Sequence, residues 1–296
     1  MKAAFIGVGM MGAPMCLNLL KKGHDVTAVD LNSQHLVRVK GGGASTAPTP
    51  AEAAAHADFI FTSLPMPADV ERVLTGPKGV LEGARPGTIV VDLSTNAPSA
   101  VKRLAATLAE KQVILLDGPV SGGVEGAEKA TLAIMCGGPQ EAFKRVKPLL
   151  ECMGGNVFLV GPIGSGSVAK LCNNLTSFAN LAVACESMLL ASRAGLDPEV
   201  MGQVMQASSG ASFALKRVQR KGLRGDWKQE FTIDLSYKDL SLALDLGRET
   251  GTPLSMGSLT YTLLQQARAK GWGGSDLVSV LRLLEEAVGS PVRARP

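Results

Sequence analysis

Short apolar runs alternate with stretches of helical periodicity along the first half of the chain. Each run is four to six residues long, which is typical of buried strands. Proline stands at the first turn of three helical stretches, where its fixed φ suits a helix start. This alternation predicts a doubly wound, mainly parallel sheet, and we expect its last strands to depart from the parallel pattern. The predicted strands are residues 3–6, 26–29, 59–64, 88–93, 113–117, 132–136 and 157–160, and the predicted helices are 13–22, 50–57, 98–111 and 139–150.

The pattern changes at a cluster of Gly, Pro and Ser at residues 161–167. Beyond it almost every stretch has helical periodicity, beginning with a long stretch over residues 168–194 that is rich in Ala, Leu and Ser. We therefore predict an α/β chain of two domains. A Rossmann-type doubly wound nucleotide-binding domain covers residues 1–162, and an all-helical domain that starts with a long interdomain helix covers 163–296. Further helices are predicted at residues 198–207, 213–221, 234–250, 253–270 and from 275.

A glycine-rich turn of the form GxGxxG follows the first apolar run directly. Its first glycine permits the tight turn, the second lets the backbone approach a pyrophosphate, and the third lets the helix pack on the strand. The second predicted strand ends at Asp30, about twenty residues further on, where a carboxylate can bind both ribose hydroxyls of NAD. Because Asp30 would repel a 2′-phosphate, we predict NAD as the cofactor in preference to NADP. The predicted cofactor contacts in the turn are Gly7, Gly9, Met10, Met11 and Gly12.

Composition narrows the class of protein. The chain has 296 residues, of which 46% are hydrophobic, so it can bury a full core. Its net charge of +4 suits the binding of small anionic molecules but is too diffuse to indicate nucleic-acid binding. No apolar run is expected to span a bilayer. A basic stretch over residues 216–224 could face an anion, although a solvated helix face is the simpler interpretation.

The cysteines and histidines predict no special chemistry. Five cysteines without a CxxC spacing indicate reduced thiols in a cytoplasmic protein. Cys16, Cys172 and Cys185 lie in apolar helical stretches and are expected to be buried. The three histidines lack the spacing of ligands, so no metal site is expected.

Two segments could carry chemistry. A Ser-Gly-Gly turn, residues 121–123, follows a predicted buried strand, and its hydroxyl and unhindered backbone N–H groups could hold a carboxylate; a plain flexible turn is the alternative. Lys170 and Asn174 are four residues apart, so they share one face of the long helix. The positive end of the helix dipole and apolar neighbours would lower the pKa of Lys170 and suit it to general acid/base work, whereas the alternative is an ordinary surface lysine.

Four segments in order resemble the β-hydroxyacid dehydrogenase family, which contains 3-hydroxyisobutyrate dehydrogenase and tartronate semialdehyde reductase. They are residues 7–19, 117–123, 164–174 and 238–243, and together they extend over most of the chain. The resemblance implies that the substrate carboxylate is held by Ser121, Gly122 and Gly123. It also implies that Lys170 is the acid/base and that Asn174 orients the substrate. Lys238 would contact both cofactor and substrate, with Asp239 nearby, and further cofactor contacts would come from Leu64, Pro65 and Thr95.

The implied function is NAD-dependent interconversion of a small 3-hydroxy acid, such as 3-hydroxyisobutyrate, and its semialdehyde, by a homodimer or homotetramer. Semialdehyde reductases of the tartronate or succinic type and serine dehydrogenases remain alternatives. Two other classes are disfavoured. A non-catalytic NAD(P)-binding scaffold would be expected to lack Lys170, which this sequence has. A 6-phosphogluconate dehydrogenase would be expected to have a longer helical domain than the one predicted here. Around Phe213, where relatives often carry substrate-contacting aromatics, the sequence turns basic, so the substrate beyond its carboxylate is not predicted.

Overall fold

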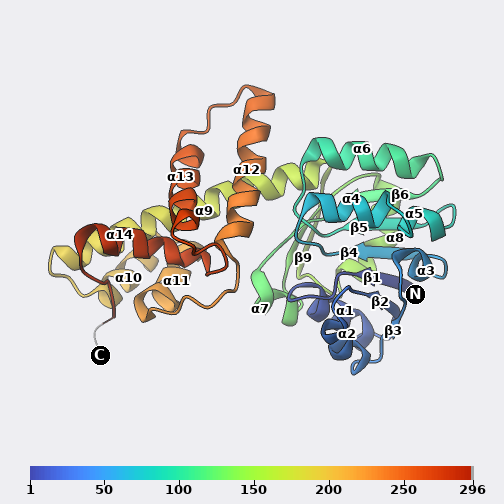
Figure 1. Cartoon of the computed structure of the whole chain (residues 1–296), viewed down its shortest axis with the longest axis horizontal. Helices are drawn as coiled ribbons and strands as arrows, with labels where there is room; N and C mark the ends of the chain where they lie inside the picture. The colour runs from blue at the N-terminus through green and yellow to red at the C-terminus, as the bar shows by residue number, and fades with distance from the viewer. Residues whose placement is uncertain (295–296) are drawn as a thin grey trace. The chain divides into compact units, whose positions relative to one another are not determined.

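The computed structural model describes residues 1–294 and divides into two compact units (Figure 1). The α/β unit is Met1–Lys170 and the helical unit begins at Leu171. The division falls at residue 170 rather than at 162, because one continuous helix, α9 (Ser165–Arg193), contributes its first turns to the α/β unit and the rest to the helical unit. Each unit has a hydrophobic core of its own.

The α/β unit is built on a nine-stranded sheet, counted over the described residues, with the order β3-β2-β1-β4-β5-β6-β8-β7 and with β9 beside β8. The first six strands pair in parallel, whereas β8 is antiparallel to β6 and β7 and parallel to β9, so the expected departure at the end of the sheet is confirmed. The strands are β1 (Lys2–Ile6), β2 (Asp25–Val29), β3 (Ser45–Thr46), β4 (Phe59–Thr62), β5 (Ile89–Asp92), β6 (Ile114–Asp117), β7 (Val120–Ser121), β8 (Ala133–Gly137) and β9 (Asn156–Gly161).

Helices cover both faces of this sheet. Successive strand residues point to opposite faces, so Phe5 and Phe61 pack with α1, α2, α7 and α8, while Ala4 and Ile60 pack with α3 to α6. The sequence pattern did not predict α2, α4, α5 or α7, which are short or have few apolar residues. The helices are α1 (Gly12–Lys21), α2 (Ser33–Lys40), α3 (Pro50–Ala54), α4 (Pro67–Thr75), α5 (Val80–Gly83), α6 (Pro98–Ala109), α7 (Gly123–Glu128) and α8 (Gln140–Leu150).

The helical unit packs around the apolar side of α9, which supplies Leu171, Phe178, Leu181 and Met188 to its core. The predicted last helix is instead a 3-10 turn, η2 (Leu277–Val280), followed by α14 (Leu281–Val288). The other elements are α10 (Pro198–Gln206), α11 (Phe213–Arg220), η1 (Gly222–Arg224), α12 (Ile233–Thr250) and α13 (Ser255–Ala269).

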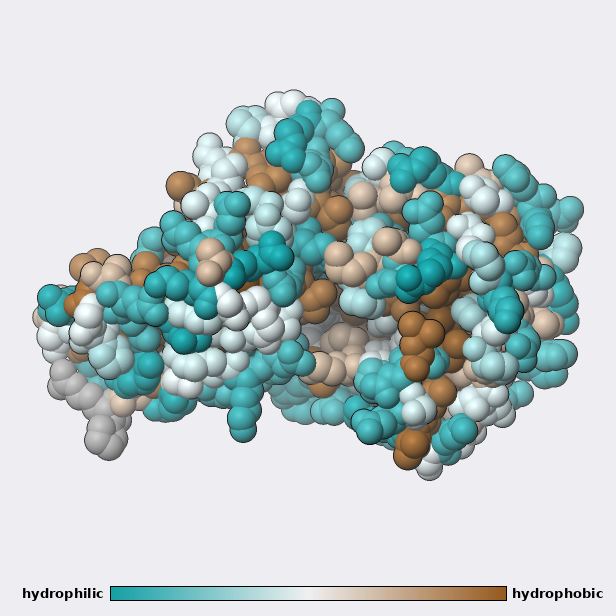
Figure 2. Space-filling view, viewed as in Figure 1, coloured by the Kyte–Doolittle hydropathy of each residue, from teal (hydrophilic) through white to brown (hydrophobic). Residues whose placement is uncertain are grey.

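Helix α9 corrects two expectations from the sequence. It is 29 residues long and, by length and composition alone, is apolar enough to cross a membrane, whereas no such run is expected from the sequence. Its buried side chains, Leu171, Phe178, Leu181 and Met188 among them, belong to the core of the helical unit, and we interpret it as a core helix. Cys172, expected to be buried, is exposed, because it lies on the side of α9 away from that core. On the face of each unit that is in view, Figure 2 shows hydrophobic residues interspersed with hydrophilic ones.

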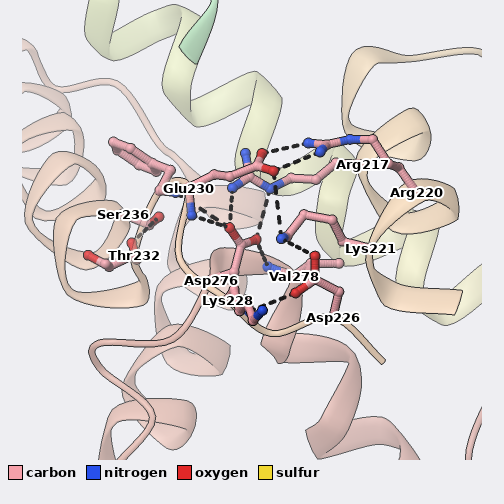
Figure 3. A network of polar contacts seen from close by, with 11 residues as sticks. Arg217, Arg220, Lys221, Asp226, Lys228, Glu230, Thr232, Ser236, Asp276 and Val278 are labelled. Atoms are coloured by element: carbon pink, nitrogen blue, oxygen red, sulfur yellow. Dashed lines mark hydrogen bonds and ion pairs between the residues drawn. The ribbon is translucent and has the colours of Figure 1, made fainter. Parts of the chain in front are cut away.

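The basic stretch over residues 216–224 is largely neutralised within the helical unit (Figure 3). Arg217 is ion-paired with the fully buried carboxylate of Asp276. The buried ammonium of Lys221 lies 2.7 Å from Asp226, and Arg220 forms a two-pronged pair with Glu230. Arg220 and Lys221 thereby fasten the loop after η1 to the end of α11, and Arg217 ties α11 to the residue before η2. Lys216, Arg220 and Arg224 are exposed, as the interpretation of a solvated face expects.

Candidate active site

The glycine turn between β1 and α1 has two positions where only glycine fits. Gly7 has φ +87°, and a Cβ there would lie 2.4 Å from the carbonyl oxygen of Ser63. A Cβ on Gly12 would lie 1.9 Å from the carbonyl oxygen of Gly7. For a Cβ on Gly9 the nearest atom beyond its two chain neighbours would be 3.7 Å away, in the ring of His35. The missing side chain of Gly9 therefore leaves backbone open for an approaching group, as a pyrophosphate requires.

Asp30 lies directly after β2 and faces this turn. One carboxylate oxygen accepts a hydrogen bond of 2.8 Å from the backbone N–H of Val8, and the other accepts one of 2.8 Å from that of Asn32. The side chain is 12% exposed. Since each carboxylate oxygen can accept more than one hydrogen bond, Asp30 is oriented yet retains capacity for ribose hydroxyls. The turn and Asp30 together fit NAD.

The carboxyl ends of β4 and β5 are tied together by the buried carboxylate of Asp92. Asp92 accepts hydrogen bonds from the hydroxyl of Thr62, at 2.8 Å, and from the backbone N–H of Ser94, at 3.1 Å. The hydroxyl of Ser94 in turn accepts from the N–H of Leu64 at 2.9 Å. Burial raises the pKa of Asp92, against the opposing effect of these hydrogen bonds. Leu64, Pro65 and Thr95 thus follow adjacent strands at one edge of the sheet, and their contact with NAD stays a prediction.

The Ser-Gly-Gly segment has the backbone of a shaped turn. Ser121 ends the short strand β7, which pairs with β8, and α7 begins at Gly123. Gly122 and Gly123 have φ of +135° and +66°, so both lie where side chains are disfavoured. Gly122 and Gly123 are exposed, with their backbone accessible to a ligand. These observations suit a carboxylate cradle, and that role stays a prediction.

Asp117 connects this segment to the helix that carries Lys170. This connection is not predicted from the sequence. Asp117 ends β6 and is 1% exposed. One carboxylate oxygen accepts from the N–H of Gly164 at 2.8 Å, and the other from the N–H of Ser167 at 2.6 Å. A buried carboxylate thereby satisfies two donors at the positive end of α9. Burial raises the pKa of Asp117, and the two N–H bonds oppose that rise.

Lys170 is 8% exposed, in the second turn of α9. The alternative of an ordinary surface lysine is therefore wrong, since lysine is rarely buried without a specific environment. Asn174 follows four residues later on the same helix and lies in the helical unit.

Within the helical unit, Asn174 belongs to a chain of polar groups. Its amide nitrogen donates to Asp239 at 2.7 Å, and its amide oxygen accepts from Asn173 at 3.1 Å. The ammonium of Lys238 lies 2.9 Å from the second carboxylate oxygen of Asp239. Asp239 is 2% exposed, so its charge is balanced by Lys238. The structure thus brings Asn174 and Lys238 together through Asp239, to which the sequence analysis gave no role of its own.

Comparison with known proteins divides the chain between residues 161 and 164, just before α9 begins at Ser165. Residues 2–161 match the family model for the NAD binding domain of 6-phosphogluconate dehydrogenase. Residues 164–284 match that for the NAD-binding of NADP-dependent 3-hydroxyisobutyrate dehydrogenase.

The similarity to known proteins extends over nearly the whole chain. The 2-(hydroxymethyl)glutarate dehydrogenase of Eubacterium barkeri is 39% identical, over 98% of this chain and 97% of its own. The NAD-dependent L-serine dehydrogenase of Pseudomonas aeruginosa is 35% identical, over 97% and 98% respectively. The solved structure of Mycobacterium tuberculosis 3-hydroxyisobutyrate dehydrogenase with L-serine is 32% identical, over 95% of this chain and 98% of that one, with a TM-score of 0.85.

Proposed function

The chain belongs to the β-hydroxyacid dehydrogenase family, and on that premise we propose that Lys170 is the general acid and base with which it interconverts a small 3-hydroxy acid and its semialdehyde. It is an NAD-dependent dehydrogenase that acts on the hydroxyl group of a hydroxy acid. Bound NAD supplies the hydride acceptor, while the protein supplies orientation and proton transfer. The glycine turn and Asp30 hold the cofactor.

The observation that carries the assignment is the burial of Lys170 near the start of α9. Lysine is rarely buried without a specific environment, and a buried amine beside a bound hydroxyl or carbonyl group can exchange a proton with it. In oxidation the neutral Nζ takes the hydroxyl proton. In reduction the ammonium polarises the aldehyde carbonyl and returns that proton.

The remaining predicted residues recognise the substrate. Ser121, Gly122 and Gly123 receive its carboxylate through hydroxyl and backbone N–H donors. Asn174 has its amide oriented by Asp239, which leaves its second N–H for the substrate. Lys238, held by the same carboxylate, is the further predicted contact for substrate and cofactor.

The relatives point to a common substrate core. 3-Hydroxyisobutyrate, L-serine and 2-(hydroxymethyl)glutarate all contain a CH₂OH group on the carbon next to a carboxylate, and they differ only in the third substituent of that carbon. We propose a 2-substituted 3-hydroxypropanoate as the substrate class. A tartronate semialdehyde reductase would act on the same core with a hydroxyl as substituent, whereas succinic semialdehyde lies outside it.

The test is NADH formation by the purified protein with a panel of such acids that differ in this substituent, with glycerate and 4-hydroxybutyrate included. We expect turnover with at least one member and none with 4-hydroxybutyrate. Lys170→Ala should lower kcat by ~10²–10⁴ and leave NADH binding unchanged. Lys144→Ala, an exposed lysine paired with Glu141 on α8, is the matched control.

Retention of more than about a tenth of the wild-type kcat in Lys170→Ala would contradict the assignment of the acid/base. No turnover with any acid, despite NADH binding, would favour the non-catalytic scaffold instead. Turnover of 4-hydroxybutyrate alone would place the enzyme with the succinic semialdehyde reductases.

We also propose that the enzyme works in the cytoplasm as a homodimer or homotetramer. All five cysteines are free, as a reducing compartment would keep them. The helical unit exposes large apolar side chains on several helices, which a second copy could cover. They include Val183 and Leu190 of α9, Val200 and Val204 of α10, and Met256 and Leu259 of α13.

A further inference from the structure

The imidazole of His35, on α2, lies beside the carboxylate of Asp30. Its Nδ1 is 3.2 Å from an oxygen of Asp30, and its Nε2 is 3.3 Å from the amide nitrogen of Asn32. The ring also borders Gly9, where an added Cβ would be 3.7 Å from it. His35 therefore stands where the glycine turn meets the acidic residue, the two features that fit NAD. Its side chain is 44% exposed, so it is open to solvent protons.

The hydrogen-bond partners assign the neutral form of this ring. Nδ1–H donates to Asp30, and Nε2 accepts from the amide of Asn32, whose oxygen is occupied by the N–H of Gln34. A second proton at Nε2 would face the Asn32 amide with another donor and break that contact. The charged ring would keep its pair with Asp30. Protonation thus changes the net charge of the Asp30–His35 pair from −1 to zero.

We propose that His35 is a specificity-determining residue that makes discrimination between NAD and NADP depend on pH. With the ring neutral, the charge of Asp30 repels a 2′-phosphate. With the ring protonated, that repulsion is cancelled and the imidazolium offers a donor to the phosphate. Among side chains, histidine is the one whose unperturbed charge change lies between pH 5 and 8, so this is the range in which the proposal is tested.

Other charges around His35 are carried by side chains of neighbouring elements. On α2 itself Arg38 pairs with Glu128 of α7, and Lys40 lies near the C-terminus of the helix. Helix α1, which packs against α2, carries Lys21 and the buried thiol of Cys16. Strand β2 begins with Asp25, at the end opposite Asp30. Among these charged groups, Asp30 is the one whose side chain lies within hydrogen-bond distance of the His35 ring.

The experiment is a calorimetric titration of the purified protein with NADH and with NADPH, at about pH 5.5 and about pH 8. The ratio of the two Kd values is compared between wild type and His35→Gln. We expect this ratio, NADPH over NADH, to fall on acidification by about tenfold more in wild type than in the variant. The 2′-phosphate itself gains a proton near pH 6, but that contribution is the same for both proteins.

Two further variants serve as a positive and a negative control. Asp30→Asn should lower the NADPH-to-NADH ratio already at about pH 8, because the repelling charge is gone. His24→Gln removes the histidine before β2, at the opposite end of the strand from Asp30, and should keep the wild-type dependence on pH. An identical change of the ratio with pH in wild type and His35→Gln would overturn the proposal. Since no substrate is present, that result would leave the proposed reaction untouched.

Discussion

The amide nitrogen of Asn174 donates a 2.7 Å hydrogen bond to the buried carboxylate of Asp239. The same carboxylate pairs with Lys238, so one side chain fixes which way the Asn174 amide faces and where the Lys238 ammonium lies. An amide turned by half a rotation would present an oxygen instead of an N–H to a substrate.

Asp239→Asn should disable this arrangement, with a loss of stability of about 1–3 kcal/mol because Asp239 is buried. We expect kcat/KM for the hydroxy acid to fall by about 10–100-fold, because Asn174 loses its fixed orientation and Lys238 its partner. Steady-state kinetics measure the effect, and NADH titration checks the cofactor site. Asp245→Asn, an exposed position on the same helix, is the control. Wild-type kcat/KM in Asp239→Asn would show that the polar chain does not orient substrate.

Asp117→Asn should loosen the start of α9. An amide can accept only on its oxygen, so the N–H of Gly164 or of Ser167 would lose its acceptor and face an NH₂ group. The loss of one such buried acceptor costs about 1–3 kcal/mol in the free energy of unfolding, measurable by urea denaturation. Because Lys170 lies one turn beyond Ser167, kcat should fall as well. Unchanged kcat with reduced stability would limit Asp117 to a structural role.

The two glycines of the cofactor turn should respond differently to alanine. Gly12→Ala places a Cβ 1.9 Å from the carbonyl oxygen of Gly7, so it should destabilise the fold by several kcal/mol. Gly9→Ala meets no protein atom within 3.7 Å and should change stability by less than about 0.5 kcal/mol. It should nevertheless weaken NADH binding by about tenfold or more, because its methyl group occupies the open backbone. Thermal unfolding and NADH titration separate the two effects, and tight NADH binding by Gly9→Ala would contradict this use of the turn.

The thiols should react with Ellman's reagent in a fixed order. Cys172 is exposed and should react at once. Burial raises the pKa of Cys16 and of Cys136 to about 12, so neither is a thiolate at about pH 8 and both should react only after unfolding. If Cys172 is the thiol that reacts first, Cys172→Ser should abolish the fast phase of the reaction with Ellman's reagent. A fast phase that survives in this variant would place the reactive thiol elsewhere.

Local signals in the sequence predicted on which elements many of the candidate site residues lie. The turn at Gly7–Gly12, the acidic residue Asp30 after β2, and the segments after β4 and β5 all occur where predicted, because each depends on a strand and the few residues that follow it. The short helices α2, α4 and α5 were missed, since a few apolar residues set no clear period. Cys172 was misassigned because an apolar helix says which residues are apolar but not which face is covered.

By itself the sequence determined the alternation of the longer strands and helices, the change to an all-helical second half, the glycine turn and the lysine helix. These follow from spacing and from residue type over fewer than about twenty neighbours. Tertiary structure decided which distant groups meet. The carboxylate of Asp117 caps a helix that starts 48 residues later in the chain, Asp239 orients Asn174 across 65 residues, and the cations of residues 216–224 find partners in loops. Buried charges need partners of opposite charge or hydrogen-bond donors, and these come from distant parts of the chain that packing brings together. A local sequence pattern therefore does not predict them.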